Sequence, residues 1–298
     1  MNITAQMVKE LREKTQAGIM DCKKALVETD GDMEKAVVWL REKGIAKAGK
    51  KAGRVAAEGL CNVVSCGNKA VLYELNSETD FVAKNEKFIN LVEKVGQVIL
   101  SSNATNTEEA LKVVDNGQDL NTIILEASGV IGEKISLRRV TVVNKKDDEL
   151  FGTYKHMGGS IVSCVVISNG DETIAKDVAM HVAAQSPRYL TKEDIPSEEL
   201  AKEKEIILHQ AINENKESAK PKPEQIVIEK IVPGRLEKEL KEICLLSQPF
   251  VKNPDVTVAG YLGKASVKEF VRLKVGEGIE KEVVDFAAEV AAQAGLNK

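Results

Sequence analysis

Apolar residues recur at helical spacing in the first part of the chain. Met7 and Leu11 share one face of a first helix that Thr4 can cap. The segment "AGIM" ends this helix and "DCKKALVET" follows as a second one. A third helix can be capped by Asp32 and reaches about Gly44. The pattern predicts an independent module of three short helices.

Further along, short apolar runs predict strands. "EGLCNVVSC", "KAVLYEL" and a helix from Asn85 give the order strand, strand, helix. "LFGTYKH", "SIVSCVVIS" and "DETIAKDVAMHVAAQSP" repeat that order later in the chain. The repeat predicts an α+β core of two related β-sheet/helix subdomains, joined by the segment "ASGVIGEKISLRRVTVV".

A strongly charged stretch interrupts the second subdomain. Its two amphipathic segments, separated by a Pro-bearing turn, predict an inserted helical hairpin. Pro233 lacks a backbone donor, and we expect it to kink or end the second segment. A strand, "VKEFVRLKV", and an Ala-rich helix, "EVVDFAAEVAAQA", complete the chain. The predicted divisions are a helical module with its linker at 1–54, core subdomain N at 55–143, core subdomain C at 144–279 with the insertion at about 188–245, and a C-terminal helical module at 280–298.

The composition narrows the class of protein. At 298 residues the chain is long enough for two or more domains with cores of their own. A formal net charge of -4 gives no general attraction to nucleic acid or to an anionic membrane. The sequence shows neither an apolar stretch of transmembrane length nor a signal peptide, and its five scattered cysteines fit a reducing compartment. We therefore expect a cytoplasmic protein without direct nucleic-acid or membrane partners.

One segment, "GIAKAGKK", comes near a nucleotide-binding motif. It matches the spacing of a P-loop, but Lys51 stands where Ser or Thr would bind magnesium, and the segment follows a helix instead of a strand. A solvated basic linker is the better interpretation. Cys61 and Cys66 have a spacing that is marginal for zinc, and they would point to opposite faces of a strand. We expect no metal and no cofactor.

A cysteine and a histidine could together form a nucleophilic site. His156 and Cys164 are close in sequence, but neither has the local signature of an active site around it. We therefore predict that the protein is not an enzyme, although residues distant in sequence can meet in space. In the alternative, a Cys/His enzyme, Cys164→Ala would abolish activity.

The turn "NSETDFVAK" places an aromatic residue among polar ones, where a strand pattern meets a helix pattern. In one interpretation Asp80 caps a helix and Phe81 folds back against the core as a staple. In the other, Phe81 is an anchor that the turn holds out to enter a pocket of a partner. The residues of the turn leave both interpretations open.

Five blocks of sequence resemble a known family. "LREKTQAGIMDCKKAL", "ETDFVAK", "HVAAQSP", "CLLSQPFV" and "VGEGIEK" occur in the order found in the elongation factor Ts family of bacteria. Members of this family are guanine-nucleotide exchange factors for the translational GTPase elongation factor Tu. The resemblance covers nearly the whole chain. It implies a ubiquitin-associated-like N-terminal module, two related core subdomains, a helical insertion and a C-terminal helical module.

The resemblance also implies which residues contact elongation factor Tu, in its GDP and nucleotide-free forms. The "TDFV" turn would enter the GTPase, with Phe81 near its magnesium and switch region, which favours the anchor. His156 would have a contact role in place of a catalytic one. The implied contact residues are Thr79, Asp80, Phe81, Val82, Arg12, Ile19, Met20, Ile131, Gly132 and His156. The resemblance implies no catalytic residue and no bound cofactor or metal.

Two departures from the family pattern bear on the shape of the protein. Gln16 stands where the family has Gly, in the turn that presents Ile19 and Met20, and Pro233 lies within the insertion. A homodimer and a two-plus-two assembly with the GTPase are both compatible with the sequence. The competing interpretation is a helical adaptor module on a scaffold core, without nucleotide exchange. Only exchange requires a dedicated wedge at "TDFV".

Overall fold

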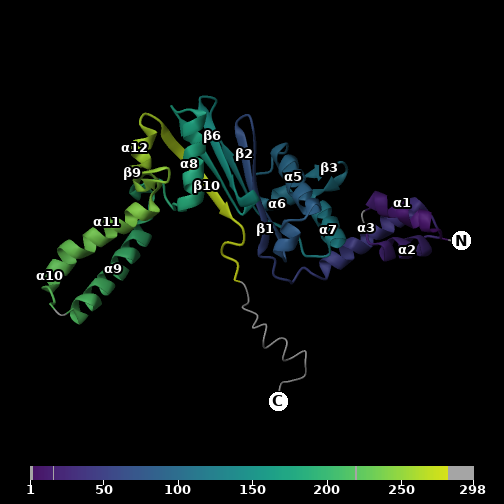
Figure 1. Ribbon diagram of the computed structural model, residues 1–298, viewed down its shortest axis with the longest axis horizontal. Helices are drawn as coiled ribbons and strands as arrows, with labels where there is room; N and C mark the ends of the chain where they lie inside the picture. The colour runs from purple at the N-terminus through teal and green to yellow at the C-terminus, as the bar shows by residue number, and fades with distance from the viewer. Residues whose placement is uncertain (1–2, 16, 219, 281–298) are drawn as a thin grey trace, which may run out of the picture. The chain divides into compact units, whose positions relative to one another are not determined.

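The chain folds into a mixture of helices and sheets, which confirms the α+β class. The computed structural model describes residues 3–15, 17–218 and 220–280 (Figure 1). Gln16 and the predicted C-terminal helix "EVVDFAAEVAAQA" lie outside these residues.

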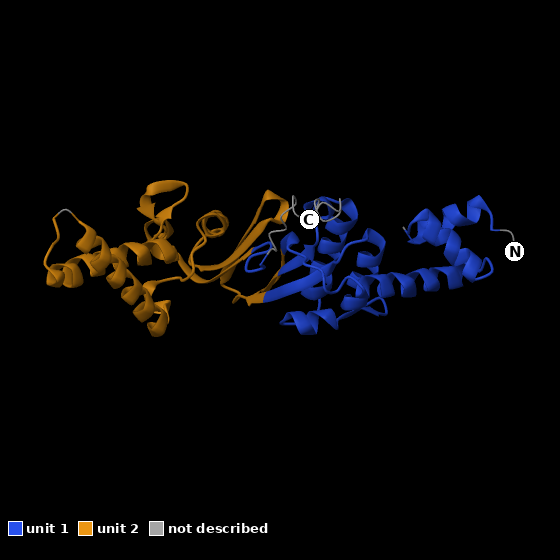
Figure 2. Cartoon of the chain, turned by 90° about the horizontal axis from the view of Figure 1, so that it is seen from below, with its two compact units in different colours: residues 1–62, 73–141, 274–298 blue, residues 63–72, 142–273 orange. Residues whose placement is uncertain are grey.

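Two compact units make up the chain (Figure 2). Unit 1 consists of residues 1–62, 73–141 and 274–298, and unit 2 of residues 63–72 and 142–273. The sequence-based boundaries of the modules and their family-like layout stay a prediction.

Three helices at the start of unit 1 form the predicted small module: α1 (Ala5–Thr15), α2 (Ile19–Glu28) and α3 (Met33–Gly49). The side chains of Thr4 and Asp32 accept hydrogen bonds from backbone N–H groups three residues on, with lengths of 3.3 and 3.0 Å. Both predicted caps are therefore confirmed. All three helices contribute to the buried core of the module, which contains Leu11, Cys22, Ala25, Leu26 and Ala36.

A three-stranded sheet of order β1-β2-β5 follows this module. β1 (Glu58–Cys66) and β2 (Lys69–Ser77) match the two predicted strands, and β5 (Ser136–Asn144) is the third. The predicted helix is α5 (Glu86–Leu100), and the Asn85 side chain caps it with a 2.9 Å hydrogen bond. One apolar face of this helix is buried: Phe88, Leu91, Val92, Val95 and Ile99.

Several short elements of unit 1 were not predicted from the sequence. The turn after β2 forms a single helical turn, α4 (Asp80–Ala83). Between α5 and β5 the chain forms α6 (Thr107–Leu111), β3 (Val114–Asp115), β4 (Gln118–Asp119) and α7 (Leu120–Ile131). The segment that the sequence indicated as a connector is therefore mainly helical at its start.

The expectation that α3 ends near Gly44 and leads into a solvated linker is wrong. The helix continues to Gly49, because Gly44 packs directly against Gly129 of α7. A Cβ added at Gly129 would lie 2.7 Å from the Cα of Gly44, so only glycine permits this crossing. The cost of a glycine inside a helix is about 0.5–1 kcal/mol, and here the close approach of the two backbones explains it.

Unit 2 contains a second sheet, of order β10-β7-β6. β6 (Glu149–His156) and β7 (Ile161–Ser168) are antiparallel, and β10 (Ser266–Lys274) is the predicted last strand. α8 (Glu172–Gln185) packs on β6 and β7. The core between them includes Val165, Ile167, Ala175, Val178, Ala179 and Val182.

The predicted helical hairpin is present in unit 2 as α9 (Ser197–Glu217) and α11 (Val232–Ile243). Four buried residues form its own small core: Ile207, Ala211, Val227 and Val232. After the hairpin, the chain forms β8 (Pro249–Phe250), β9 (Asn253–Thr257) and α12 (Val258–Leu262) before it reaches β10.

Pro233 does not end the helical segment in which it lies, so of the two predicted outcomes only a kink stays a prediction. The short helix α10 (Glu224–Ile226) continues into a π-helical turn, Val227–Ile231, and this turn leads directly into α11 with Pro233 in its first turn. Helix starts tolerate proline because their N–H groups have no partner within the helix. The π turn changes the hydrogen-bond spacing just before the proline, so that the backbone stays helical through it.

A buried histidine joins α8 to the segment that follows the hairpin. His181 has no exposed surface. Its Nδ1 accepts a hydrogen bond from the Val251 N–H at 3.1 Å, so the proton lies on Nε2, which is 2.9 Å from Oε1 of Gln248. Gln248 in turn donates to the carbonyl of Glu242 at 2.6 Å. Burial lowers the pKa of His181, since a charged ring would be poorly solvated there.

We expect acid to destabilise unit 2 through His181. An imidazole in the unfolded chain has a pKa of about 6.5, so below that pH the unfolded state binds more protons than the folded one. The free energy of unfolding should fall as the pH decreases from about 6.5 through the lowered folded pKa, by at most about 1.4 kcal/mol per pH unit.

Urea unfolding of wild type and of His181→Asn at pH values between 7.5 and 5.5 measures this effect. The asparagine oxygen is bonded to Cγ, as Nδ1 is, so it can still accept from Val251, but it does not titrate. Parallel stability curves for the two proteins would contradict the prediction.

Candidate partner-binding site

The turn after β2 carries Phe81 on its outside. The Thr79 side chain caps α4 by accepting a 3.4 Å hydrogen bond from the Val82 N–H. Val82 and Ala83 are both 9% exposed, so this face of the helical turn lies against the core. Phe81 is 80% exposed. A capped turn with a buried face thus presents one aromatic ring to solvent.

The structure contradicts the first of the two interpretations of this turn. Asp80 does not cap the helix, because Thr79 takes that position and Asp80 is the first helical residue. Asp80 instead forms an ion pair of 2.6 Å with Lys84, which lowers the pKa of the Asp80 carboxyl. Phe81 is not a staple against the core, because its ring is exposed. The geometry favours the anchor.

Two glutamates bind the turn to the segment after α7. The Glu133 carboxylate accepts hydrogen bonds from the N–H groups of Glu78 and Thr79, at 3.1 and 3.0 Å. It also accepts from the Thr79 hydroxyl at 2.6 Å. In the opposite direction, the Glu78 carboxylate accepts from the Lys134 N–H at 2.6 Å. We call this reciprocal arrangement of Glu78 and Glu133 the carboxylate clamp.

Ile131 and Gly132 lie at the end of α7, next to this clamp in the chain. Gly132 has a φ of 94°, a left-handed conformation that ends the helix and that glycine adopts without strain. Lys51 donates a hydrogen bond to the Gly132 carbonyl. Ile131 and Gly132 therefore lie close to the turn at Thr79, and their shared contact role stays a prediction.

The implied contact residues of the N-terminal module are exposed. Ile19 and Met20 begin α2, with exposed fractions of 54% and 75%. Arg12 and Ile19 line a cavity of about 390 Å³ on the surface of the module, together with Ile3, Thr4, Ala5, Val8, Lys9 and Lys23. An apolar surface next to cationic side chains is suited to an amphipathic element that carries acidic residues.

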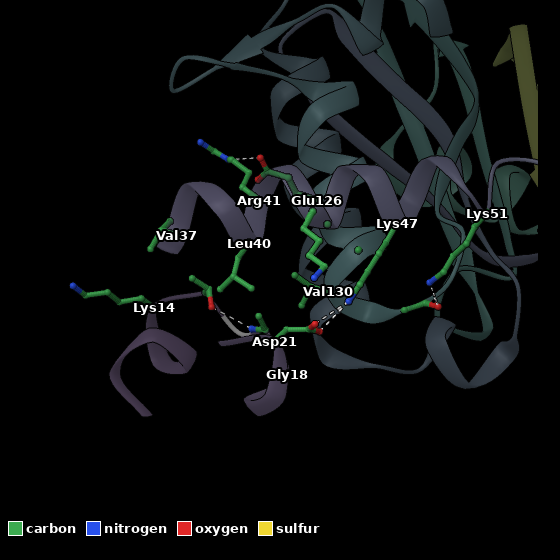
Figure 3. Close-up of a pocket in the computed structure, with 16 residues that line it drawn as sticks. Lys14, Gly18, Asp21, Val37, Leu40, Arg41, Lys47, Lys51, Glu126 and Val130 are labelled. Carbon is green, nitrogen blue, oxygen red and sulfur yellow. Dashed lines mark hydrogen bonds and ion pairs between the residues drawn. The ribbon is translucent and has the colours of Figure 1, made fainter. Parts of the chain in front are cut away.

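A larger cavity of about 580 Å³ lies between α2, α3 and α7 (Figure 3). Four of its charged side chains form two ion pairs. Arg41 pairs with Glu126, and Lys47 pairs with Asp21 at 3.0 Å. The first pair joins α3 of the N-terminal module to α7, and the second joins α2 to α3 within the module. Among the described residues no group of three or more His, Cys, Asp or Glu side chains could hold a metal ion.

His156 lies at the end of β6 in unit 2, where the hairpin turns toward β7. Its exposed ring stacks on Tyr154, with 6.1 Å between the ring centroids. The next residue, Met157, is 76% exposed and has a φ of 45°, which is unusual for a residue with a side chain. Sequence reasoning missed Met157; the signal is a large apolar residue before two glycines at a strand end.

Cys164 does not form a nucleophilic pair with His156. Cys164 opposes Thr153 in the ladder and His156 opposes Ile161, so the two side chains are three positions apart, about 10 Å along the strands. Cys164 has no exposed surface, and burial raises the pKa of its thiol to about 12. A thiol in this environment stays protonated near neutral pH and is a poor nucleophile.

Comparison with known proteins identifies the family. The family model for elongation factor TS matches residues 78–277. Elongation factor Ts of Acholeplasma laidlawii (strain PG-8A) is 54% identical over 296 residues, which cover 98% of this chain and 99% of that protein. The chain belongs to the elongation factor Ts family. It is thus a translation elongation factor that acts in protein biosynthesis as a nucleotide-exchange factor.

In this member of the elongation factor Ts family, the region matched by the family model begins at Glu78, the first residue of the carboxylate clamp. The exposed Phe81 lies three residues on. Within the described residues no helix has the length and apolar character needed to cross a membrane.

We expect Phe81→Ala to leave the stability of the free protein nearly unchanged, within about 0.5 kcal/mol, because an exposed ring contributes little to folding. Phe88→Ala is the matched control, since Phe88 has no exposed surface. Loss of that buried ring should cost about 3–5 kcal/mol. Urea unfolding of both variants measures the free energy of unfolding. A large decrease for Phe81→Ala would favour the interpretation of Phe81 as a staple against the core.

Proposed function

We propose that the chain accelerates the release of GDP from elongation factor Tu, and that Phe81 is the wedge that enters the GTPase near its magnesium and phosphate site. The observation that carries this proposal is the 80% exposure of Phe81 on a capped turn. The similarity to elongation factor Ts supports the choice of partner.

Because the Phe81 ring is exposed in the free protein, its burial can still contribute to binding a partner. Full burial of a side chain such as Phe contributes about 1.5–3 kcal/mol. Rigid aromatic side chains that fill a pocket of the partner are typical centres of protein interfaces. Phe81 on α4 has this character, since the cap at Thr79 and the buried Val82 fix its backbone from the other side.

Exchange then follows from thermodynamic linkage and needs no covalent chemistry. A factor that binds the nucleotide-free GTPase more tightly than its GDP form must weaken GDP binding by the same ratio. The "TDFV" turn displaces the magnesium-binding and phosphate-binding elements of the GTPase, and this displacement makes the factor bind the nucleotide-free form more tightly than the GDP form. GTP rebinds when it is abundant and expels the factor. The chain itself needs neither nucleotide nor metal, and it acts in the cytoplasm, where translation takes place.

The remaining contact residues hold the GTPase while the wedge acts. In unit 1 these are Arg12, Ile19 and Met20 on the N-terminal module, and Ile131 and Gly132 at the end of α7. In unit 2 the β6–β7 turn would contribute His156 together with the neighbouring Met157. A homodimer or a two-plus-two complex stays a prediction.

The release of a fluorescent GDP analogue from elongation factor Tu tests the wedge. We expect wild type to accelerate release and Phe81→Ala to be slower by roughly tenfold to hundredfold, the equivalent of one buried ring. Val114→Ala is the matched control, because Val114 is also a large apolar side chain, 66% exposed, and has no role in the proposed site.

If Phe81→Ala and Val114→Ala both match wild type, Phe81 is not the wedge. If folded wild type does not accelerate release from a competent partner, the proposal of exchange fails and the adaptor without exchange replaces it.

Met20 should affect affinity more than the exchange step. Met20 is 75% exposed at the start of α2 and lies on a different element from the wedge. In the same assay, we expect Met20→Ala to raise the factor concentration for half-maximal acceleration several-fold, since buried apolar area is lost from the complex. The maximal rate should stay near that of wild type. A lower maximal rate at unchanged half-maximal concentration would contradict a docking role.

A further inference from the structure

We propose that Glu133 is a positioning residue for the wedge, and that it acts on Phe81 through the backbone and hydroxyl of Thr79. This inference rests on the proposed function, which makes Phe81 the wedge. The Glu133 carboxylate accepts hydrogen bonds from Glu78 and Thr79, just before the wedge, and it belongs to a segment more than fifty residues further along the chain.

The contacts of Glu133 converge on the residues just before the wedge. One carboxylate oxygen accepts from two consecutive N–H groups, those of Glu78 and Thr79, at 3.1 and 3.0 Å. The other accepts from the Thr79 hydroxyl at 2.6 Å. Hydrogen bonds to an ionised acceptor are about twice as strong as neutral ones. Glu133 therefore satisfies three donors that follow the end of β2.

The Thr79 hydroxyl connects Glu133 to the start of α4 through two hydrogen bonds. When this hydroxyl donates to Glu133, its lone pairs remain free to accept from the Val82 N–H, and the observed distance is 3.4 Å. Donation thus fixes the orientation of the capping oxygen. The helical turn that begins at Asp80, and with it the direction of Phe81, depends on this cap.

The clamp is supported from both sides. The Glu78 carboxylate accepts from the Lys134 N–H at 2.6 Å and from Arg54 Nη1 at 3.1 and 3.2 Å. The Lys134 ammonium donates to the Arg54 carbonyl at 2.8 Å. Because each glutamate bonds to the backbone beside the other one, the turn and the end of α7 cannot separate without loss of both sets of hydrogen bonds.

The clamp also explains why the wedge can stay exposed. An isolated helical turn of four residues is not stable by itself, because it fixes several backbone angles for few hydrogen bonds. Hydrogen bonds to the backbone order this turn before binding, so that less conformational entropy is lost when Phe81 enters its pocket. Loss of the clamp should therefore slow the wedge step, while the docking residues on the N-terminal module remain in place.

The test compares Glu133→Gln with wild type in the GDP-release assay, at several concentrations of the factor. The amide keeps the size of the side chain but cannot accept with both ends. We expect the maximal rate to fall by about tenfold, the effect of one lost hydrogen bond to a charged group, at nearly unchanged half-maximal concentration. Glu108→Gln, a change at an exposed carboxylate on α6, is the matched control and should behave as wild type.

A double variant separates positioning from a general structural effect. If Glu133 acts through the wedge, Phe81→Ala with Glu133→Gln should exchange no more slowly than Phe81→Ala alone. A further variant tests the hydroxyl: Thr79→Val keeps the shape, removes the hydroxyl, and should lower the maximal rate as Glu133→Gln does. If Glu133→Gln folds poorly, folded Thr79→Val decides the test, and a wild-type rate in it overturns the positioning role.

The outcomes distinguish this inference from the proposed function. A wild type that fails to accelerate release overturns both, and this failure is visible before any variant is made. If wild type is active, a wild-type rate in Glu133→Gln overturns the positioning role. The same loss from Glu133→Gln in the presence and absence of the Phe81 ring also overturns it, because the effect would then not pass through the wedge.

Discussion

A buried charge on the middle strand of the first sheet holds unit 1 together. The Glu74 side chain on β2 has no exposed surface, and its carboxylate accepts from Arg138 at 3.1 Å and from Arg139 at 2.6 Å, both on β5. It also accepts from the Gly276 N–H, which follows β10, at 2.8 Å. Removal of one partner from such a group costs about 3–5 kcal/mol, so the register of β2 against these segments is strongly fixed. β2 ends three residues later at Ser77, and the position of the wedge turn follows from that register.

The same unit carries the proposed docking residues of the N-terminal module, and α7 is the element that connects them to the proposed wedge. Along its length α7 meets α3 at the contact between Gly44 and Gly129, and at its end Gly132 leads into the carboxylate clamp. Lys51, just past the end of α3, bonds to the Gly132 carbonyl. Because α7 packs against α3 and ends at the carboxylate clamp, the backbone of this one helix sets the distance between the N-terminal module and the turn that carries Phe81. Contacts of this kind let two distant surface residues engage one partner without a large loss of entropy.

The sequence predicted what depends on periodicity and missed what depends on contacts between distant segments. The strands around "EGLCNVVSC" and "KAVLYEL" were recognisable as short apolar runs, and in "KAVLYEL" the run fits a strand that is buried on both faces. α7 was missed, and α3 was cut short, because Gly44 and Gly129 resemble helix breakers until the crossing that requires them is known. Phe81 could be a staple or an anchor for the same reason: its local sequence permits both. Glu133 has no local signal at all, since one carboxylate among many becomes special only through its place beside Thr79.

The physical problem of an exchange factor of this kind is to keep an aromatic ring away from its own core. Apolar support for Phe81 would lower the energy of the free protein, but it would compete with the partner for the same surface. Hydrogen bonds between Glu133 and the backbone of the turn do not compete, because they leave the ring untouched. The burial energy of Phe81 therefore remains available until a pocket of suitable shape accepts it. The carboxylate clamp thus stabilises the turn through polar contacts alone, and it leaves the apolar surface of Phe81 for the partner.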